Sequence, residues 1–262
     1  MPEAIFLDIL LLFAGGLTAG LLGGLLGIGG GIILIPLLRF GVGLHPAAAA
    51  ATCIVAVFFT TLGGAYRHHR AGNLRIRPLI PVFVAGAAAT VLFSSLFSTL
   101  AVRDTWMDLA MAFVFALVSA RMLWEGLLPR QRPASPPREG GGTLLVQKGI
   151  VGAAGGVLPG LLGIGTGGVL VPAFTFWLRM PIKAAVAGSL LCFSANAFIS
   201  ASFKLAQGFV VLEVVPALAL GTLLGADLGA RVNGRFRSRT VKLLFGLVFA
   251  CVSVRLATTG GS

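Results

Sequence analysis

Charged residues are scarce in this chain: Asp, Glu, Lys and Arg together make up 11% of its 262 residues. Soluble globular domains carry roughly 25% charged residues, so a water-soluble fold of this length could not cover its surface with so few. Hydrophobic residues account for 57% of the sequence, and the mean hydropathy is +0.99. The lack of charge therefore excludes an ordinary soluble domain and indicates that lipid is the surrounding solvent.

Carboxylates are the scarcest charged type, with 8 Asp and Glu against 20 Lys and Arg. In a soluble protein the net charge of +12 would suggest nucleic acid. Here the basic residues form short clusters between apolar segments, so no nucleic-acid partner is expected. A membrane-embedded enzyme for phosphates would need clustered carboxylates to hold metal. No carboxylate lies in the middle of a long apolar run, which predicts no enzyme, no catalytic residue and no metal site.

Cysteine is also rare, and Cys53, Cys192 and Cys251 all lie in apolar runs without a CxxC motif. This pattern predicts small buried hydrophobic residues rather than disulfides or metal ligands. The acidic start of the chain, with Glu3 and Asp8, lacks the basic region of a cleaved signal peptide. The first apolar segment is therefore expected to stay in the membrane.

Eight apolar runs are close to the length of about 20 residues that crosses a bilayer. They lie near residues 6–26, 47–66, 78–100, 106–128, 144–162, 183–206, 210–230 and 241–258. Two shorter apolar pieces, 32–44 and 168–178, are predicted to be half-helices. The stretch 129–143 is rich in Pro, Gly and charge, so it is predicted to be a cytoplasmic linker between a first transmembrane repeat, 1–128, and a second, 144–262.

The two halves repeat each other at one constant spacing in the numbering, the repeat offset (163 − 27 = 136). The segment 24–31, GLLGIGGG, matches the segment 160–167, GLLGIGTG, and the offset pairs Pro36 with Pro172 without a gap. Nine of the thirteen positions from 24 to 36 are identical in the two copies. A single ungapped offset that also places the prolines predicts an internal duplication.

The loop charges predict that the two repeats run in opposite directions. Arg and Lys cluster in 66–77, 129–148 and 231–242, which the positive-inside rule places in the cytoplasm. The loops 101–105 and 204–213 carry little net charge and are predicted to be extracytoplasmic. Loop 66–77 and its counterpart 204–213 thus fall on opposite sides, which predicts an inverted-topology repeat, as in many secondary transporters. Both chain termini are then expected on the extracytoplasmic side.

Two glycine clusters, 27–31 and 163–168, would stop a helix, because glycine costs about 1 kcal/mol per residue in a helix interior. Broken backbone at membrane depth must be buried in protein or line a cavity. It exposes amide N–H groups and the partly positive start of a half-helix, which can hold an anion without a buried Arg or Lys. The cluster 163–168 also satisfies GxGxxG, but its flanks are membrane helices rather than a βαβ unit, so no nucleotide cofactor is expected.

For the other small and polar residues of the apolar runs, a structural role in helix packing is the alternative to substrate binding. This is the expectation for the glycines at Gly15, Gly16, Gly20, Gly23, Gly24, Gly152, Gly155 and Gly156. Single Ser and Thr hydroxyls in the apolar runs are expected to bond back to their own helix. The amide of Asn196, which pairs with Thr60 at the repeat offset, is costly in lipid and should face the interior. For Asn196 an interhelical hydrogen bond and a substrate contact are both open.

Charged residues near the apolar runs are expected at helix ends. Asp227 lies four residues before Arg231, and Arg121 lies four residues before Glu125, which predicts two ion pairs within single helices. Lys204 is also expected at a helix end.

The doubled glycine motif resembles the TauE/SafE sulfite exporter family. In each copy the motif leads into a short apolar piece with Pro36 or Pro172, and then into an Ala-rich helix with Thr or Ser. The resemblance covers nearly the whole chain. It implies a plasma-membrane permease, in the inner membrane of a Gram-negative cell, for sulfite, sulfonates such as sulfoacetate, thiosulfate or related sulfur-containing anions. The second copy departs from the triple glycine of the first, because Thr166 replaces one glycine.

The sequence thus predicts an all-α, polytopic transmembrane bundle that acts as a secondary transporter for a small anion, by alternating access at the repeat interface. A passive anion channel shares these features, and a membrane-embedded enzyme is a weaker alternative. No cofactor is expected, and H⁺ or Na⁺ is a candidate coupling ion. The predicted substrate-binding residues are Gly27, Gly29, Gly30, Gly31, Thr52, Cys53, Thr60, Gly163, Gly165, Thr166, Gly167, Ser189 and Asn196.

Overall fold

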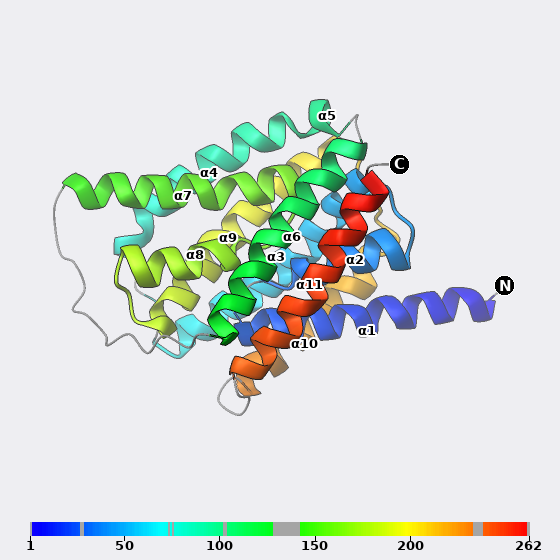
Figure 1. Ribbon diagram of the computed structural model, residues 1–262, viewed down its shortest axis with the longest axis horizontal. Helices are drawn as coiled ribbons and strands as arrows, with labels where there is room; N and C mark the ends of the chain where they lie inside the picture. The colour runs from blue at the N-terminus through cyan, green and yellow to red at the C-terminus, as the bar shows by residue number, and fades with distance from the viewer. Residues whose placement is uncertain are drawn as a thin grey trace.

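The computed structural model describes residues 2–26, 29–72, 74, 76–101, 104–127, 142–232 and 238–260, and all regular structure within them is helical (Figure 1). The long helices are α1 (Pro2–Leu26), α3 (Pro46–Arg70), α4 (Ile80–Ser95), α6 (Asp104–Leu127), α7 (Gly142–Leu162), α9 (Ile182–Ala206), α10 (Val215–Val232) and α11 (Ser238–Gly260). The short ones are α2 (Gly31–Pro36), η1 (Leu37–Gly41), η2 (Arg77–Leu79), α5 (Phe97–Leu100), α8 (Gly167–Pro172) and η3 (Ala173–Trp177). Each long helix coincides with a predicted apolar run, which confirms the helical membrane bundle.

The helix bounds recur at the repeat offset. Adding the offset to the first and last residues of α2, η1 and α3 gives the bounds of α8, η3 and α9. The turns repeat as well, because Gly72 and Gly208, which follow α3 and α9, both have positive φ. Gly43 and Arg179, which precede α3 and α9, also have positive φ, at 77° and 52°. Since positive φ is costly for residues other than glycine, the second copy keeps this turn against the preference of its own residue.

Each glycine cluster is followed by a helix of half-membrane length. The six residues of α2 continue directly into the five of η1, and α8 continues into η3 in the same way. Eleven residues at 1.5 Å each extend about 16 Å, about half of the ~30 Å hydrocarbon core. Pro36 and Pro172 lie where the α-helical part changes to π-helix. Proline explains this change, since it lacks the N–H that an α-helical hydrogen bond needs.

Small residues bring α1 against α10, and α7 against α4, through equivalent contacts. The paired contacts are Gly16 with Leu218 and Gly152 with Val82, then Gly20 with Thr222 and Gly156 with Gly86. Within each pair of contacts, the repeat offset relates the two glycines to each other and the two partner residues to each other. Gly16 corresponds to Gly152, for example, and Val82 corresponds to Leu218. A methyl group on any of the first-named glycines would overlap backbone of the neighbouring helix. All eight glycines predicted to serve packing lie in close approaches to a neighbouring segment, which confirms that role.

The centre of the bundle is formed by α3 and α9, which are counterparts in the two repeats. The rings of Phe58 and Phe198 lie 5.6 Å apart, and Gly64 lies against Leu190. Moving forward along α3 therefore means moving backward along α9, so the two helices are antiparallel. The second pair of counterparts, α6 and α11, also runs antiparallel (Figure 1).

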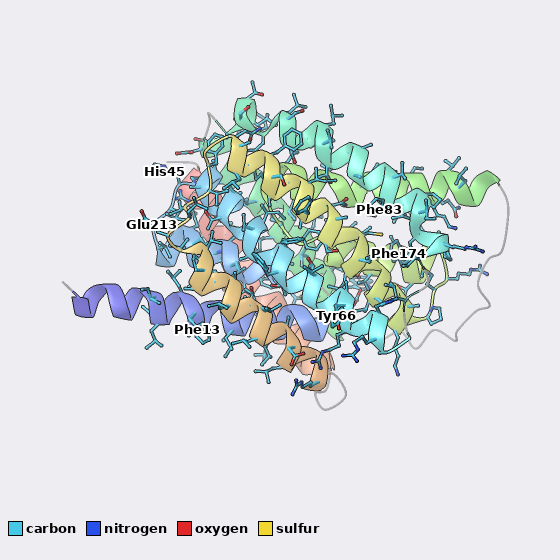
Figure 2. The ribbon with its side chains drawn as sticks, turned by 180° about the vertical axis from the view of Figure 1, so that it is seen from behind. Phe13, His45, Tyr66, Phe83, Phe174 and Glu213 are labelled. Atoms are coloured by element: carbon cyan, nitrogen blue, oxygen red, sulfur yellow. The ribbon has the colours of Figure 1, made fainter. Side chains whose placement is uncertain are left out.

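Five helical segments of the described residues are long and apolar enough to cross a membrane. They are Pro46–Arg70, Arg77–Ser95, Asp104–Leu127, Leu145–Leu162 and Lys183–Ala206. Shorter apolar stretches lie in the remaining long helices at Ile9–Gly24, Val215–Gly229 and Gly246–Thr258. Large apolar side chains stand exposed on the outside of the bundle, as expected for a surface in contact with lipid (Figure 2).

Two exposed tryptophans on α6 are separated along the helix by about the thickness of a membrane. Trp106 and Trp124 are 64% and 61% exposed and lie near opposite ends of the helix. The two residues are 18 positions apart (124 − 106), which corresponds to about 27 Å at 1.5 Å per residue, close to the ~30 Å thickness of the hydrocarbon core. Tryptophan favours both membrane interfaces, so α6 is expected to cross the bilayer with one Trp at each surface.

Two of the predicted apolar runs are not helical over their whole length. The run 78–100 is not one helix, because α4 ends at Ser95 and α5 starts after a bend. The run 210–230 becomes helical only at Val215. In the segment before α10, the N–H of Val211 donates to the hydroxyl of Thr52 at 3.0 Å instead of to a helical carbonyl.

One cysteine and the linker also differ from the prediction. Cys53 and Cys192 are buried as expected, whereas Cys251 is exposed on α11. The predicted linker lies outside the described residues up to position 141, and its last two residues, Gly142 and Thr143, already belong to α7.

Candidate functional site

The two glycine-broken segments meet inside the bundle. A methyl group at Gly31 would lie 3.1 Å from the backbone nitrogen of Gly165 and 3.4 Å from the sulfur of Cys53. The Cys53 thiol donates to the carbonyl of Gly31 at 3.5 Å. Because Cys53 belongs to α3, the meeting point lies against one of the two central helices. Residues from the two copies of one motif thus share one buried neighbourhood.

Glycine is required in these segments for two physical reasons. Gly29, Gly30 and Gly163 have φ values of 81°, 74° and 65°, which L side chains rarely adopt. A methyl group at Gly30 would also lie 2.6 Å from the carbonyl oxygen of Ala19, and one at Gly163 would overlap the carbonyl oxygen of Ala50. The breaks therefore serve close packing as well as a turn of the chain.

The breaks leave polar groups without helical partners. The first N–H groups of a helix have no acceptor within that helix, and its start carries partial positive charge. Thr166 directly precedes α8 and is fully buried, and its side chain does not cap the helix. Among the described residues no hydrogen-bond partner is found for the Thr166 hydroxyl. A buried hydroxyl without a partner is costly, so this position suits a bound polar ligand.

Lys204 places a buried cation beside the end of α7, which leads into the second break. It lies in the last turn of α9, which confirms its predicted position at a helix end, and the structure shows in addition that it is buried there. The side chain is 0% exposed, and its ammonium nitrogen donates to the carbonyl of Pro159 at 2.9 Å. It also lies 4.4 Å from the centre of the Phe97 ring.

Two structural features explain how this lysine is buried at the end of α9. Pro159 lies in the last turn of α7, where the carbonyl groups lack helical partners and attract a cation. The segment after α9 then folds back over the helix end, with the ring of Phe209 against Phe97 at 5.2 Å. The break after α7 thus supplies an acceptor for Lys204, and the returning chain excludes solvent from it.

More polar atoms near Lys204 are left unpaired. Gln207, three residues further on, donates to the carbonyl of Ser94 at 2.9 Å. Within the described part of the chain, the other side-chain oxygen of Gln207 and the buried hydroxyl of Ser94 have no partner. The end of α9 therefore combines one ammonium group with unsatisfied buried oxygens, which is typical of a site that holds a ligand or water.

The remaining predicted residues divide by what their side chains contact. The hydroxyls of Thr60 and Ser189 bond to carbonyls of their own helices, Ala56 at 3.2 Å and Val186 at 2.9 Å. Thr52 accepts from Val211, and so ties the start of α3 to the segment that covers Lys204. Gly167 is buried and begins α8, whereas Gly27 lies outside the described residues.

Asn196 belongs to α9, and its side chain faces α4 and α7. Its amide donates weakly to the carbonyl of Gly155 at 3.5 Å, and it contacts Gly86. No partner for its oxygen is found among the residues that the structure describes. The interhelical hydrogen bond is therefore present, and a substrate contact at Asn196 stays a prediction.

A partly buried ion pair, absent from the sequence prediction, holds η1 against α6. Arg39 donates to both carboxylate oxygens of Asp108, at 2.9 Å and 3.2 Å, and also to the carbonyl of Leu44. Asp108 is 2% exposed. The corresponding positions of the second repeat are Thr175 and Leu244, so the pair belongs to the first copy alone. A two-bond Arg–carboxylate pair of this kind orients the half-helix of one repeat.

The ion pairs predicted within single helices are confirmed. Arg121 binds Glu125 at 2.8 Å, and Arg231 binds Asp227 at 2.7 Å. Asp227 is also paired with Arg67 of α3, which connects the ends of α3 and α10.

These features define a class of protein: a multi-pass helical membrane protein, with two repeated half-helices whose broken starts meet inside the bundle. The comparison with known families is more specific. Residues 12–256 match the family described as Sulfite exporter TauE/SafE, so the chain belongs to this family.

Curated relatives cover almost the whole chain. YunE of Bacillus subtilis (strain 168), described as a probable membrane transporter protein, is 24% identical over 94% of this chain and 96% of its own. A protein of Xylella fastidiosa (strain 9a5c) with the same description is 28% identical over 90% and 91%. MJ0441 of Methanocaldococcus jannaschii, also described in this way, is 23% identical over 93% of each chain. No solved structure gives a significant match.

Proposed function

We propose that this protein is a secondary transporter of a small anion, namely sulfite, a sulfonate of the sulfoacetate type or another sulfur-containing anion. The anion would bind where the two broken segments meet. The observation that carries the proposal is the close approach of Gly31 to the backbone nitrogen of Gly165 inside the bundle. The buried ammonium of Lys204 binds the carbonyl of Pro159 in the last turn of α7, just before the second break. No role as an enzyme is proposed.

The donors around this point match the needs of an oxyanion. An anion with three or four oxygens accepts several hydrogen bonds, and backbone amides at helix starts bind such groups well. The hydroxyl of Thr166 adds a donor on one side. The Lys204 ammonium has three donors and the structure uses one of them on Pro159, so it can bind an anion without leaving that carbonyl. One buried positive charge then balances one negative charge.

The orientation of the repeats supports transport by alternating access. Counterpart helices α3 and α9 run antiparallel, and if both cross the membrane the two repeats face opposite sides. The basic ends of α3 and α10 would lie in the cytoplasm and both termini outside the cell, in the plasma membrane. Gly31, Thr166 and Lys204 are buried, so the site is closed to both sides in this structure. A movement of one repeat against the other would open it to each side in turn.

Counterflow in proteoliposomes tests the proposed function. Vesicles loaded with unlabelled sulfite or sulfoacetate should accumulate the labelled anion transiently, and uptake should saturate with concentration. A channel would give neither effect, so linear flux without counterflow would favour a passive pore instead. Imposed gradients of H⁺ or Na⁺ in the same vesicles identify the coupling ion.

A matched pair of glycine variants, measured in the same counterflow assay, tests whether the anion binds at the meeting point of the two breaks. Gly31→Ala adds a methyl between Gly165 and Cys53 at a position without positive φ, so the protein should fold while the anion site narrows. Counterflow is expected to fall about tenfold or more, as when one good hydrogen bond to a charged group is lost. Gly168→Ala, at the start of the other half-helix, adds only an ordinary contact with Val118 at 3.7 Å and should transport normally. Equal rates for both variants would place the anion elsewhere.

A further inference from the structure

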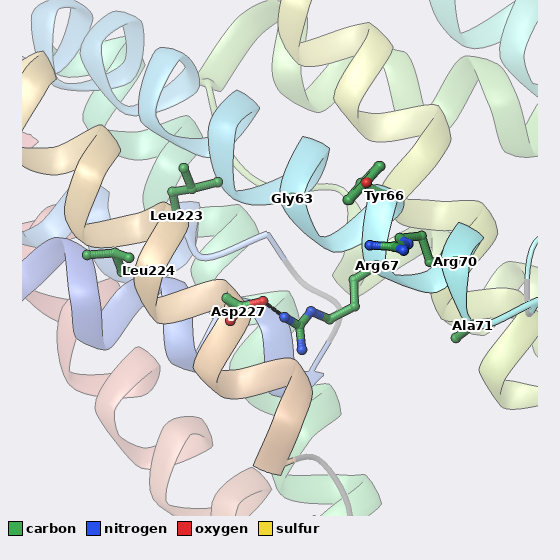
Figure 3. A pocket seen from close by; sticks show the side chains of 8 residues that line it. All are labelled: Gly63, Tyr66, Arg67, Arg70, Ala71, Leu223, Leu224 and Asp227. Atoms are coloured by element: carbon green, nitrogen blue, oxygen red, sulfur yellow. Dashed lines mark ion pairs between the residues drawn. The ribbon is translucent and has the colours of Figure 1, made fainter.

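A groove lies between the end of α3 and the end of α10, and no residue of the two glycine clusters lines it (Figure 3). Its volume is about 610 Å³. Tyr66, Arg67 and Arg70 line one side, and Leu223, Leu224 and Asp227 line the other. It is open to the outside of the bundle, because Tyr66 and both leucines are exposed.

The lining separates into a basic part and an apolar part. Arg67 and Arg70 lie in the last turn of α3, and Asp227 and Arg231 lie near the end of α10. The leucines come one turn earlier on α10, about 6 Å further from that helix end at 1.5 Å per residue. A polar head and an apolar wall one helical turn apart match the boundary between lipid headgroups and acyl chains.

The charge of the groove is positive despite its carboxylate. Asp227 is shared between Arg67 and Arg231, which leaves one positive charge in that trio. Among the ion pairs of the described residues, none involves Arg70, whose guanidinium lies 5.9 Å from the ring centre of Tyr66. The charged residues that line the groove, Arg67, Arg70 and Asp227, thus carry a net charge of +1 beside exposed leucines, and Arg231 adds a further positive charge next to the groove.

The groove breaks the symmetry of the repeats. The positions that correspond to Tyr66, Arg67, Arg70 and Asp227 at the repeat offset are Ser202, Phe203, Ala206 and Val91. The helix contacts recur in both copies, whereas this set of charges occurs in one copy and at one end of the bundle. A feature needed only for the shared architecture would recur in both.

We propose that the groove binds one anionic glycerophospholipid, with its phosphate between Arg70 and the Arg67–Asp227 pair and an acyl chain along Leu223 and Leu224. Positive charge near the membrane surface attracts anionic lipid, and exposed leucine suits an acyl chain. By the orientation proposed above, the lipid would come from the cytoplasmic leaflet. The lipid site does not depend on which anion is transported.

Native mass spectrometry of the full chain tests this site, with phosphatidylglycerol and phosphatidylcholine as the probes. Wild-type protein should retain one phosphatidylglycerol in preference to phosphatidylcholine. Arg70→Gln should weaken retention about tenfold or more, because a hydrogen bond to a charged phosphate is lost. Arg77→Gln removes an exposed arginine that does not line the groove, and it should bind lipid as the wild type does.

Three results would overturn the lipid proposal. They are equal retention of the two lipids, unchanged binding by Arg70→Gln, and displacement of the lipid by sn-glycerol 3-phosphate at matched concentration. The last result would show that the groove takes a free phosphate rather than a membrane lipid. Counterflow of sulfite is measured separately, so failure of the lipid proposal leaves the proposed transport function standing.

Discussion

Lys204→Met is expected to abolish anion counterflow while the protein stays folded and at least as stable as the wild type. Lys204 is fully buried, and a buried charge costs free energy that a methionine of similar length does not. The carbonyl of Pro159 keeps a donor in the variant, because the Ser200 hydroxyl also bonds to it at 2.6 Å. The anion, in contrast, loses its only buried ammonium partner at the site among the described residues. Losing a hydrogen bond to a charged group weakens binding by about 10–100-fold.

Lys183→Met is the matched control, since Lys183 lies exposed at the start of the same helix. It should retain wild-type counterflow and a wild-type unfolding midpoint. Unchanged counterflow in Lys204→Met would remove this residue from the anion site. A variant that loses its fold instead would show that Lys204 serves to cap the end of α7.

Gly163→Ala is expected to prevent folding. The residue has φ of 65° and a methyl group there would overlap the carbonyl oxygen and carbon of Ala50 on α3. The left-handed conformation alone costs a non-glycine residue about 1–2 kcal/mol. The overlap is with backbone of a buried helix, which cannot move aside as a flexible side chain could. The yield of monodisperse protein in detergent measures the effect.

Gly208→Ala separates the two causes, because Gly208 has φ of 76° but no atom within 4 Å of an added methyl. This variant should fold, with a loss of stability of about 1–2 kcal/mol from conformation alone. If Gly163→Ala gave the same yield and unfolding midpoint as Gly208→Ala, the close approach of the second break to α3 would not be essential to the fold.

The fold was largely predictable because its main signals are local or periodic. Apolar length predicts the long helices, and the clustered glycines and prolines predict where α1 and α7 end and where α2 and α8 begin. Spaced glycines such as Gly16 and Gly152 predict close helix contacts, but not which helix is contacted. The symmetric pairing of α1 with α10 and of α7 with α4 depends on the three-dimensional arrangement of both repeats.

The charged part of the site could not be predicted from neighbouring residues. Lys204 looks like a helix-end lysine until the returning segment around Phe209 and Val211 covers it. Arg39 and Asp108 are 69 residues apart, so nothing local joins them. Hydroxyl groups posed a similar problem. The sequence around a Thr such as Thr60 is the same whether its hydroxyl bonds to its own helix, as it does here, or to a ligand.

The central claim is that one anion binds between the two broken segments beside Lys204, and crystals grown with selenite test it most directly. Selenite is the selenium analogue of sulfite, and the anomalous scattering of selenium locates it without ambiguity. The proposal predicts one strong peak near Gly31, Gly165 and the Lys204 ammonium, and its loss in crystals of Lys204→Met. A peak only in the groove at Arg67 and Arg70, or one near the breaks that persists in Lys204→Met, would contradict it.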